Sequence, residues 1–299
     1  MAEGTLRVAQ LNAGSLLEPG WDERRDTIVA WLRHLDPDVV CLQEVWQDAG
    51  TPNTAGWLVD TMPEAGWHWR FGGAPFGPEV WPDPGLSFGS AILSRWPIDE
   101  HAYHRLPVAE GDDDPAATDI PWELLHVRTA GLDVFSTHLS APPHHGRHRA
   151  RQVLAIDEHV RRIRGDLDTI EAIGIPREAM PAILCGDFNA EPDSDEIRFL
   201  CSLAAIDGST TYYQDAWRVA GDGPGLTQDW RTNPIAAAMN VPPKRIDYVF
   251  VGDPFQRRDG AGRVVTASLA FDASLTGRVA SDHTGLVVDV AWPARPPRP

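Results

Sequence analysis

The segment ILCGDFNAEP, residues 183–192, contains the pattern that decides the fold: a short apolar run that leads directly into polar residues. An apolar run of this length that is bounded by turn residues is typical of a buried β-strand. Asp187 and Asn189 follow the run, and side chains two residues apart on a strand point the same way, so both could contact one water molecule or phosphate oxygen. A strand-ending Asp and Asn is by itself more often turn chemistry, so the segment predicts a rigid strand and leaves its chemistry open.

Eight further apolar runs have the length of strands, and turn residues or helical patterns separate them. They lie at residues 6–11, 39–42, 90–93, 124–127, 134–136, 246–251, 264–271 and 286–290. Two amphipathic helices are predicted between them, one after Asp22 and one over residues 153–167, because apolar residues recur every three or four positions. A third helix is predicted to begin at Asp193, where Glu196 completes a capping-box pattern.

The order of these elements indicates the fold class. Strands and helices are mixed without the strict alternation of a doubly wound sheet, so we expect an α/β fold with substantial antiparallel pairing. Two sheets that pack face to face and are flanked by helices would satisfy this order. No internal linker divides the chain, so we expect a single domain over residues 1–292, followed by a disordered tail at 293–299.

Three long segments show neither a strand nor a helix pattern: residues 66–89, rich in Gly, Pro and Trp, the acidic residues 110–121, and residues 221–244. Irregular segments of this length in a compact domain are more often functional than idle. The aromatic residues of the first segment include Trp67, Trp69, Phe71, Phe76 and Trp81. They could stack nucleic-acid bases or bind lipid, or they could pack the segment against the sheets, which is the slightly favoured interpretation.

The composition of the 299 residues limits the function classes. The formal net charge of −17 repels polyanions and removes the attraction that supplies most non-specific affinity for nucleic acid, which weakens a nuclease interpretation without excluding it. No run approaches the roughly 18 apolar residues of a membrane helix, and the N-terminus lacks a signal-peptide pattern, so we expect a cytoplasmic protein without stable membrane insertion. Cys41, Cys185 and Cys201 have no metal-ligand spacing and are expected to be reduced.

Polar residues stand at or near the ends of five other predicted strands. They are Asn12 in RVAQLNAG, Glu44 in DVVCLQEVW, His138 in DVFSTHLS, Asp247 in KRIDYVFV, and Asp282 with His283 in VASDHTGLVV. Glu44 suits a hard cation such as Mg²⁺, which takes one or two carboxylates and keeps several waters. Asp247 is costly to bury unless it accepts hydrogen bonds, so it is expected to orient a histidine. Each position alone is more often a turn or a solvated strand end, but six strands with such residues indicate one site.

The order of seven short motifs resembles that of a known family. LNAG, LQEVW, GSAILSRWPI, STHLS, GDFNAEP, RIDYVF and SDHTG follow one another over nearly the whole chain. Their order is similar to that in the endonuclease/exonuclease/phosphatase superfamily, which includes deoxyribonuclease I. The resemblance implies a deoxyribonuclease I-like fold, a four-layer α/β sandwich of two sheets with its active site at one edge. It also implies an enzyme that hydrolyses phosphoric esters with a divalent metal ion.

The resemblance implies that Glu44 is the principal ligand of a Mg²⁺ or Mn²⁺ ion. It also implies that Asn12 and Asp282 complete the coordination of this ion, either directly or by supporting its ligands. An Arg that clamps the phosphate is not identified. Four arginines lie near the motifs: Arg147, Arg149, Arg231 and Arg245. The cluster HHGRHRAR, residues 144–151, could form a basic patch above the site or the solvated start of a helix, and the two interpretations are equally supported.

The resemblance also implies roles for the other residues. Asp187 would accept a proton from the attacking water, and Asn189 would position that water or the phosphate. His283, held in one tautomer by Asp247, would contact the scissile phosphate, and His138 would be a second phosphate contact. The reaction would then be in-line attack of a metal-organised water on phosphorus, with the metal and two imidazoles stabilising the developing charge.

The substrate is constrained less closely than the bond that is broken. GDFNAEP and SDHTG lack the extensions of the inositol phosphatases, which favours a phosphodiester, carried by a small molecule or by nucleic acid. The alternatives are a nuclease acting on DNA or RNA and, from another class, a catalytically inactive metal-binding interaction module. The residues that an inactive module would be expected to lose are all present: Glu44, Asp187, Asp282 and His283. No protein partner is inferred from the sequence.

Overall fold

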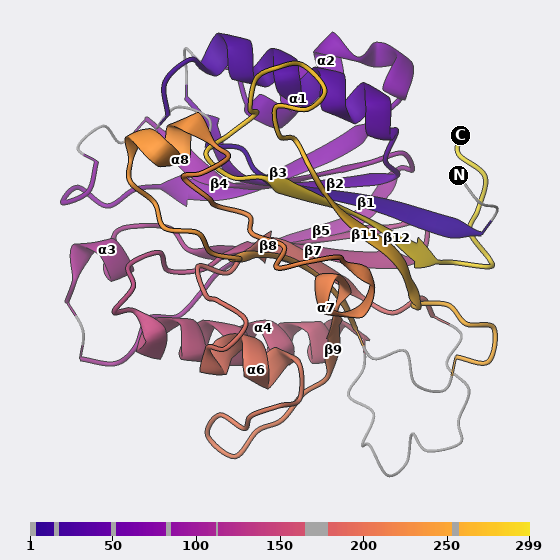
Figure 1. Ribbon diagram of the computed structural model, residues 1–299. Coiled ribbons are helices and arrows are strands. Elements are labelled where there is room, and N and C mark those ends of the chain that lie inside the picture. Colours follow the sequence, from indigo (N-terminus) through magenta and orange to yellow (C-terminus); the bar gives the residue numbers. More distant parts are fainter. Residues whose placement is uncertain are drawn as a thin grey trace.

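Two six-stranded β-sheets lie face to face at the centre of the molecule, and helices cover their outer faces (Figure 1). The computed structural model describes residues 4–14, 18–48, 52–81, 85–111, 113–164, 179–252 and 257–299. Sheet A has the strand order β11-β12-β1-β2-β4-β3, and sheet B has the order β5-β6-β7-β8-β10-β9. Helices α1 and α2 pack on sheet A, and α4 and α6 pack on sheet B. These four layers confirm the predicted α/β sandwich.

The nine predicted strands are all present. Sheet A consists of β1 (Thr5–Asn12), β2 (Val39–Gln47), β3 (His68–Pro75), β4 (Ser87–Ser94), β11 (Val264–Ala270) and β12 (Gly285–Ala291). Sheet B consists of β5 (Ile98–Arg105), β6 (Glu123–Thr129), β7 (Leu132–His138), β8 (Ile183–Asp187), β9 (Tyr213–Asp215) and β10 (Asp247–Gly252). The helices are α1 (Trp21–Leu35), α2 (Thr54–Thr61), α3 (Pro115–Thr118), α4 (Gly146–Arg164), α6 (Asp195–Leu200), α7 (Ala216–Ala220) and α8 (Pro234–Ala238), with a short 3-10 helix η1 (Pro63–Ala65).

Strands β3, β5 and β9 are the ones that the sequence does not predict. All three lie at sheet edges, where a strand buries fewer side chains and needs no continuous apolar run. The expectation that residues 66–89 are irregular is wrong for β3 and for the start of β4. Two adjacent glycines, Gly72 and Gly73, hide the strand pattern of β3, although both pair with β4.

Helices α1 and α4 confirm two of the three helix predictions, although the expected last turn of α4, with Leu167, lies outside the described residues. The third helix, α6, begins at Asp195 with Ser194 as its N-cap, two residues later than predicted. Glu196 closes no capping box, because its carboxylate Oε1 accepts a hydrogen bond of 3.0 Å from Nε of Arg149 on α4. A buried tertiary contact has therefore replaced the local one.

Three apolar layers hold the sandwich together. The central layer between the sheets includes Val8, Ile92, Val134 and Val249, the layer under α1 and α2 includes Ile28 and Leu58, and the layer under α4 and α6 includes Ile156 and Phe199. Inner strands that are buried on both faces read as continuous apolar runs, which is why the sequence reveals them. Cys41 and Cys185 lie in the central layer, and all three cysteines are free, as predicted.

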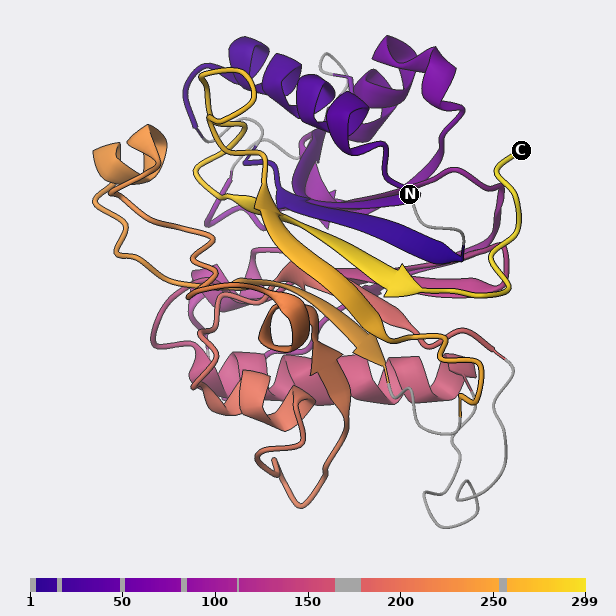
Figure 2. The same cartoon turned by 45° about the vertical axis from the view of Figure 1, so that its right-hand side comes forward.

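Strand direction brings the polar strand ends to one edge of the sandwich. β1 and β2 are parallel, and so are β7 and β8, so their carboxyl ends lie together. β12 is antiparallel to β1 and β10 is antiparallel to β8, so the amino ends of β10 and β12 lie at the same edge. This edge is on the left in Figures 1 and 2, where α3 and α8 lie.

The C-terminal residues 293–299, which the sequence predicts to be a disordered tail, contact the body of the protein. Arg298 forms ion pairs with Asp36 and Asp38, and Arg295 also pairs with Asp38. These partners come from the beginning of the chain, so the composition of the tail alone does not reveal them. The assignment of residues 1–292 to one domain stays a prediction. Among the described residues, no helix has both the length and the apolar character needed to cross a membrane.

Candidate active site

Asn12 joins the two sheets at the edge where the strand ends meet. Its side-chain nitrogen Nδ2 lies 3.1 Å from Oε1 of Glu44 in sheet A and 3.0 Å from Oδ2 of Asp187 in sheet B. Its Oδ1 accepts a hydrogen bond of 3.1 Å from the backbone N–H of Gly14, which fixes the orientation of the amide. One buried amide therefore holds two carboxylates from different sheets beside each other.

The sequence predicts that Glu44 ends its strand, and this prediction is wrong. Glu44 lies inside β2, at an irregularity of the strand. β2 continues to Gln47, and its register against β4 shifts between Leu42 and Val45. The backbone φ of Glu44 is 55°, in the left-handed region that L residues rarely adopt. A bulge of this kind turns a side chain out of the regular alternation of a strand, and such strained positions concentrate at functional sites.

A layer of buried polar side chains supports this edge from within the sandwich. Nε2 of Gln10 donates hydrogen bonds to Oε1 of Gln43 at 2.8 Å and to Oδ1 of Asp247 at 3.0 Å. Nε2 of Gln43 donates to Oγ of Ser136 in sheet B at 2.9 Å. Sequence reasoning missed Gln10 and Gln43, although each is a polar residue inside an apolar strand and must be paired if it is buried.

The predicted pairing of Asp247 with a histidine is present. Nδ1 of His283 donates to Oδ2 of Asp247 at 2.8 Å, which leaves Nε2 directed toward the edge. That Nε2 lies 3.8 Å from Oδ2 of Asp187 and 3.7 Å from Oδ2 of Asp282. The side-chain amide nitrogen of Gln228 lies 2.8 Å from Oδ2 of Asp282 and 2.8 Å from Nε2 of His283. His283 therefore stands where two carboxylates meet.

Both oxygens of Asp187 are directed by neighbours. Its Oδ1 accepts a hydrogen bond of 2.8 Å from the backbone N–H of Asn189, whose φ of 48° is also left-handed. The side-chain nitrogen of Asn189 donates to the carbonyl of Leu139 at 2.9 Å, so this residue braces the end of β8. Nε2 of His138 lies 3.5 Å from Oδ2 of Asp187, and Trp122 packs edge-on against the His138 ring with centroids 5.0 Å apart.

The carboxylates on the sheet A side repel one another. Burial and then Asp282 raise the pKa of Glu44 to about 7. Glu18, which no sequence motif indicates, has its pKa raised to about 9 by burial, Asp282 and Glu44. Arg24 lies 3.4 Å from Glu18, but it is itself buried and donates hydrogen bonds to the carbonyls of Ala13 and Ala280. This side of the edge is therefore short of positive charge.

The two histidines differ in charge. Burial and then the neighbouring His283 lower the pKa of His138 to about 3, so its ring is neutral at neutral pH. Burial also opposes charge on His283, but Asp247, Asp282 and Asp187 outweigh it and raise the pKa well above the usual range. Burial and Asp247 raise the pKa of Asp187 to about 6, which makes it a stronger base than an exposed aspartate.

All eight predicted residues thus lie at this one edge of the sandwich. The family model for the endonuclease/exonuclease/phosphatase family matches residues 9–283. The chain belongs to the endonuclease/exonuclease/phosphatase family. The matched range contains every predicted site residue, and no curated protein sequence matches the chain.

Several solved structures share the fold of this family member. An endonuclease/exonuclease/phosphatase from Beutenbergia cavernae has a TM-score of 0.68 and 24% identity, with 97% of this chain and 72% of that chain covered. The human Nocturnin catalytic domain with bound sulfate anion has a TM-score of 0.64 and 23% identity, covering 97% and 94%. D. rerio TDP2 complexed with single strand DNA product has a TM-score of 0.65 and 18% identity, covering 96% and 99%.

In this family member the segment 221–244 contributes three buried side chains that position the site. The hydroxyl of Thr227 accepts hydrogen bonds from the backbone N–H groups of Ile246 and Asp247. Gln228 contacts Asp282 as described above. Asn233 donates to the carbonyls of Ser281 and Asp282, at 2.8 and 3.0 Å, and also caps α8. The sequence predicts function for this segment from its length alone and identifies none of the three residues.

Three of the four arginines near the motifs are paired with carboxylates that are not among the eight predicted site residues. Arg149 pairs with Glu196, Arg231 with Asp229, and Arg245 with Asp215, while Arg147 is exposed. Asp215 holds Arg245 through two hydrogen bonds, of 3.0 and 2.8 Å, and both side chains are buried.

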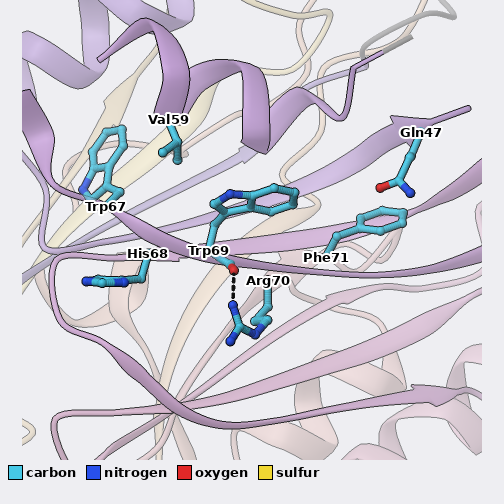
Figure 3. Close-up of a pocket in the computed structure, with 7 residues that line it drawn as sticks. All are labelled: Gln47, Val59, Trp67, His68, Trp69, Arg70 and Phe71. Atoms are coloured by element: carbon cyan, nitrogen blue, oxygen red, sulfur yellow. Dashed lines mark hydrogen bonds between the residues drawn. The ribbon is translucent and has the colours of Figure 1, made fainter. Parts of the chain in front are cut away.

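The aromatic residues of segment 66–89 divide into two groups. Trp67 is buried, and Phe76 packs on Trp46 and Phe88, as the packing interpretation predicts. Trp69 and Phe71, together with Trp67, line an open groove of about 580 Å³ beside β3, and Figure 3 shows the rings of Trp67 and Trp69 near Val59 of α2 and the ring of Phe71 near Gln47 of β2. Gln47 ends the strand that carries Glu44. This groove offers apolar surface to a ligand of suitable shape.

Proposed function

We propose that the chain hydrolyses phosphoric diesters in a reaction that depends on Mg²⁺ or Mn²⁺. The observation that carries the proposal is the contact of Asn12 with both Glu44 and Asp187. It joins a carboxylate suited to a hard cation with a carboxylate suited to take a proton, in a cluster that also contains a cationic histidine. Membership of the endonuclease/exonuclease/phosphatase family supports this reaction class.

The sheet A side of the edge fits a hard divalent cation. Glu44 and Asp282 offer oxygen ligands, and Glu18 adds a third carboxylate whose pKa is also raised by its neighbours. Glu44 and Asp282 would hold the ion, and Asn12 would brace Glu44. A bound ion of this kind polarises a phosphoryl oxygen and lowers the pKa of water.

Another group of possible ligand atoms, from Asp187, Asp247 and His283, has its members within 4.8 Å of one another. Nδ1 of His283 is already bonded to Asp247, so we assign this group to proton transfer and phosphate contact. Asp187 is ionised at neutral pH, and its Oδ2 faces His138 and His283 while Asn189 fixes Oδ1. It can therefore accept a proton from water that attacks phosphorus at this point.

Two imidazoles would stabilise the charge that develops on the phosphate. The carboxylates around His283 favour its cationic form, and its Nε2–H would reach a phosphoryl oxygen once the side-chain amide of Gln228, 2.8 Å from Nε2, turns away from that nitrogen. His138 is neutral, and its Nε2 lies 3.5 Å from Oδ2 of Asp187, so this is the nitrogen that can donate to a phosphate at the site. A charged donor and a neutral one on the same side of Asp187 would bind two phosphoryl oxygens, and fixed donors of this kind act without reorganisation.

The test is a hydrolysis panel in Mg²⁺ or Mn²⁺ that contains a chromogenic phosphodiester, a phosphomonoester, single- and double-stranded DNA, RNA and sphingomyelin. We expect turnover of phosphodiesters. The acidic net charge argues against nucleic acid as the main substrate, so cleavage of DNA or RNA far above the small diester would establish the nuclease alternative. A chain that binds the metal and cleaves nothing would be the inactive interaction module.

Asp187→Asn is the decisive variant, because it keeps the shape of the side chain and removes its basicity. We expect normal folding and a loss of kcat of about 100-fold or more. Asp133→Asn is the matched control, since Asp133 is a buried carboxylate that bonds to His126 and Arg128 rather than to the site. Retained turnover in Asp187→Asn, or equal losses in the two variants, would remove Asp187 from the proton-accepting role.

A further inference from the structure

A second cluster of metal-binding side chains lies where the acidic segment 110–121 meets the start of α4. Asp114 is the N-cap of α3, and His144 and His145 stand directly before α4. One ligand-type atom from each of the three lies within 4.8 Å of the others. The sequence singles out both segments, but the active site uses neither.

His145 is held as a metal-binding histidine would be. Its side chain is only 1% exposed, and its Nδ1 lies 2.7 Å from Oγ of Ser140. Ser140 is itself fixed, because Gln152 accepts a hydrogen bond from its N–H and Arg149 donates one to its carbonyl. When Nδ1 donates its proton to Ser140, the lone pair is on Nε2, which is the tautomer that binds a cation through Nε2.

Asp114 presents one oxygen to both imidazoles. Its Oδ1 accepts a hydrogen bond of 2.9 Å from the backbone N–H of Ala116 and so caps α3. Its Oδ2 lies 2.9 Å from Nε2 of His145 and 3.3 Å from Nε2 of His144. The two carboxylate oxygens of Asp114 therefore have different roles. Oδ1 caps the helix backbone, and Oδ2 faces two imidazole nitrogens that can both bind a metal.

The spacing and the donor types suit zinc. Ligand atoms around a tetrahedral Zn²⁺ at 2.0–2.2 Å are about 3.3 Å apart, so the present spacing needs an expansion of a few tenths of an ångström. The distance that must lengthen is the 2.9 Å between Oδ2 of Asp114 and Nε2 of the buried His145, and the side chain of Asp114 is 33% exposed, so it can make that movement. Two imidazoles and one carboxylate favour Zn²⁺ over Mg²⁺, which prefers oxygen ligands.

We propose that Asp114, His144 and His145 form a second metal site, which binds Zn²⁺ and is separate from the active site. The ion fastens the acidic segment to the start of α4 and leaves its remaining coordination positions to water on the exposed side of His144. The segment leads directly to Trp122, whose Nε1 donates to the carbonyl of Ala116 at 3.0 Å and whose ring packs on His138. Zinc bound here therefore stabilises the wall of the active site without entering it.

The test uses untagged full-length protein in saturating Mg²⁺, titrated with Co²⁺ as a spectroscopic substitute for Zn²⁺. We expect one equivalent of Co²⁺ to bind with the intense visible bands of a tetrahedral N/O site and to be displaced by Zn²⁺. We expect His144→Ala and Asp114→Asn to abolish these bands. Ser140→Ala should weaken Co²⁺ binding by about 10- to 100-fold, because it removes the partner that fixes the tautomer of His145.

His159→Ala is the matched control, because His159 and His104 form another histidine pair, with stacked rings 4.0 Å apart, and could bind metal by themselves. This variant should leave the bands unchanged. The proposal is overturned if wild-type protein gives no such bands, if His144→Ala keeps them, or if His159→Ala or Glu44→Gln removes them. These readouts do not require turnover, so they stand or fall independently of the proposed hydrolase activity.

Discussion

Replacement of Asp247 by Asn tests how the site controls His283. The buried carboxylate of Asp247 accepts from Nδ1 of His283 at 2.8 Å through one oxygen and from Nε2 of Gln10 at 3.0 Å through the other. In the Asp247→Asn variant, the oxygen of the new side-chain amide must stay with Gln10, because that partner can only donate at this position. The amide nitrogen then faces Nδ1, which can no longer carry a proton.

The loss of kcat in Asp247→Asn is set by the positive charge that His283 loses and by the N–H donor that it keeps. Having lost the proton on Nδ1, His283 keeps the proton on Nε2, so it remains a hydrogen-bond donor toward the substrate but becomes neutral. Hydrogen bonds to charged groups contribute about 1.5–3 kcal/mol and neutral ones about 1 kcal/mol, so the loss of about 0.5–2 kcal/mol corresponds to about 2- to 30-fold in rate. His283→Ala removes the donor entirely and should cost on the order of 100- to 1000-fold in kcat. The predicted order of kcat is therefore wild type, Asp247→Asn, His283→Ala.

Steady-state kinetics on a chromogenic phosphodiester give kcat, and ¹⁵N NMR of the imidazole reports the tautomer of His283. Asp215→Asn is the matched control, since Asp215 is a buried carboxylate of sheet B that pairs with Arg245. It should lose about 3–5 kcal/mol of stability with kcat of the folded protein unchanged. If Asp247→Asn has the same kcat as the wild type, or if its histidine keeps the proton on Nδ1, the assignment of Asp247 is refuted.

Two further perturbations test the metal dependence and the electrostatics. EDTA should abolish phosphodiester hydrolysis, and Mg²⁺ alone should restore it, because the carboxylates around Glu44 need a cation; full activity in chelator would contradict this. Burial raises the pKa of Glu123 well above its usual value, although Ser90 donates to it. The folded protein therefore binds the proton of the Glu123 carboxyl more tightly than the unfolded chain does. The stability that this protonated carboxyl contributes is fully present below about pH 4.3 and declines as the pH rises. Glu123→Gln should match the wild-type Tm in acid and exceed it increasingly toward alkaline pH; a pH-independent difference in Tm would show that Glu123 is not protonated in the fold.

The sequence predicts those elements whose own pattern of apolar and polar residues determines their structure. Inner strands such as β8 and β10 must be apolar on both faces, so all eight inner strands appear as apolar runs, and the edge strand β11 is the ninth. Edge strands bury less, so β3 with its glycines and β5 with its polar residues escape such a pattern. The sequence misplaces the start of α6 because Glu196 pairs with Arg149, a contact that only the tertiary structure creates.

The site divides in the same way. Residues such as Asp187 and His283 adjoin strands in recognisable motifs, so the family resemblance is enough to predict that they converge. Glu18 and Gln228 lie in irregular segments and have no motif of their own, and the chain path alone brings them to Asp282. The bulge at Glu44 is also not predictable, because a register shift depends on the partner strand.

The most direct test of the central claim is anomalous diffraction from crystals grown with Mn²⁺ and an unreactive phosphodiester analogue. We predict an anomalous peak within coordination distance of Glu44 and Asp282, with the phosphorus of the analogue beside Asp187 and Nε2 of His283. An ion bound elsewhere on the protein, or a phosphate held away from this edge while the crystals remain catalytically competent, would contradict the proposed active site.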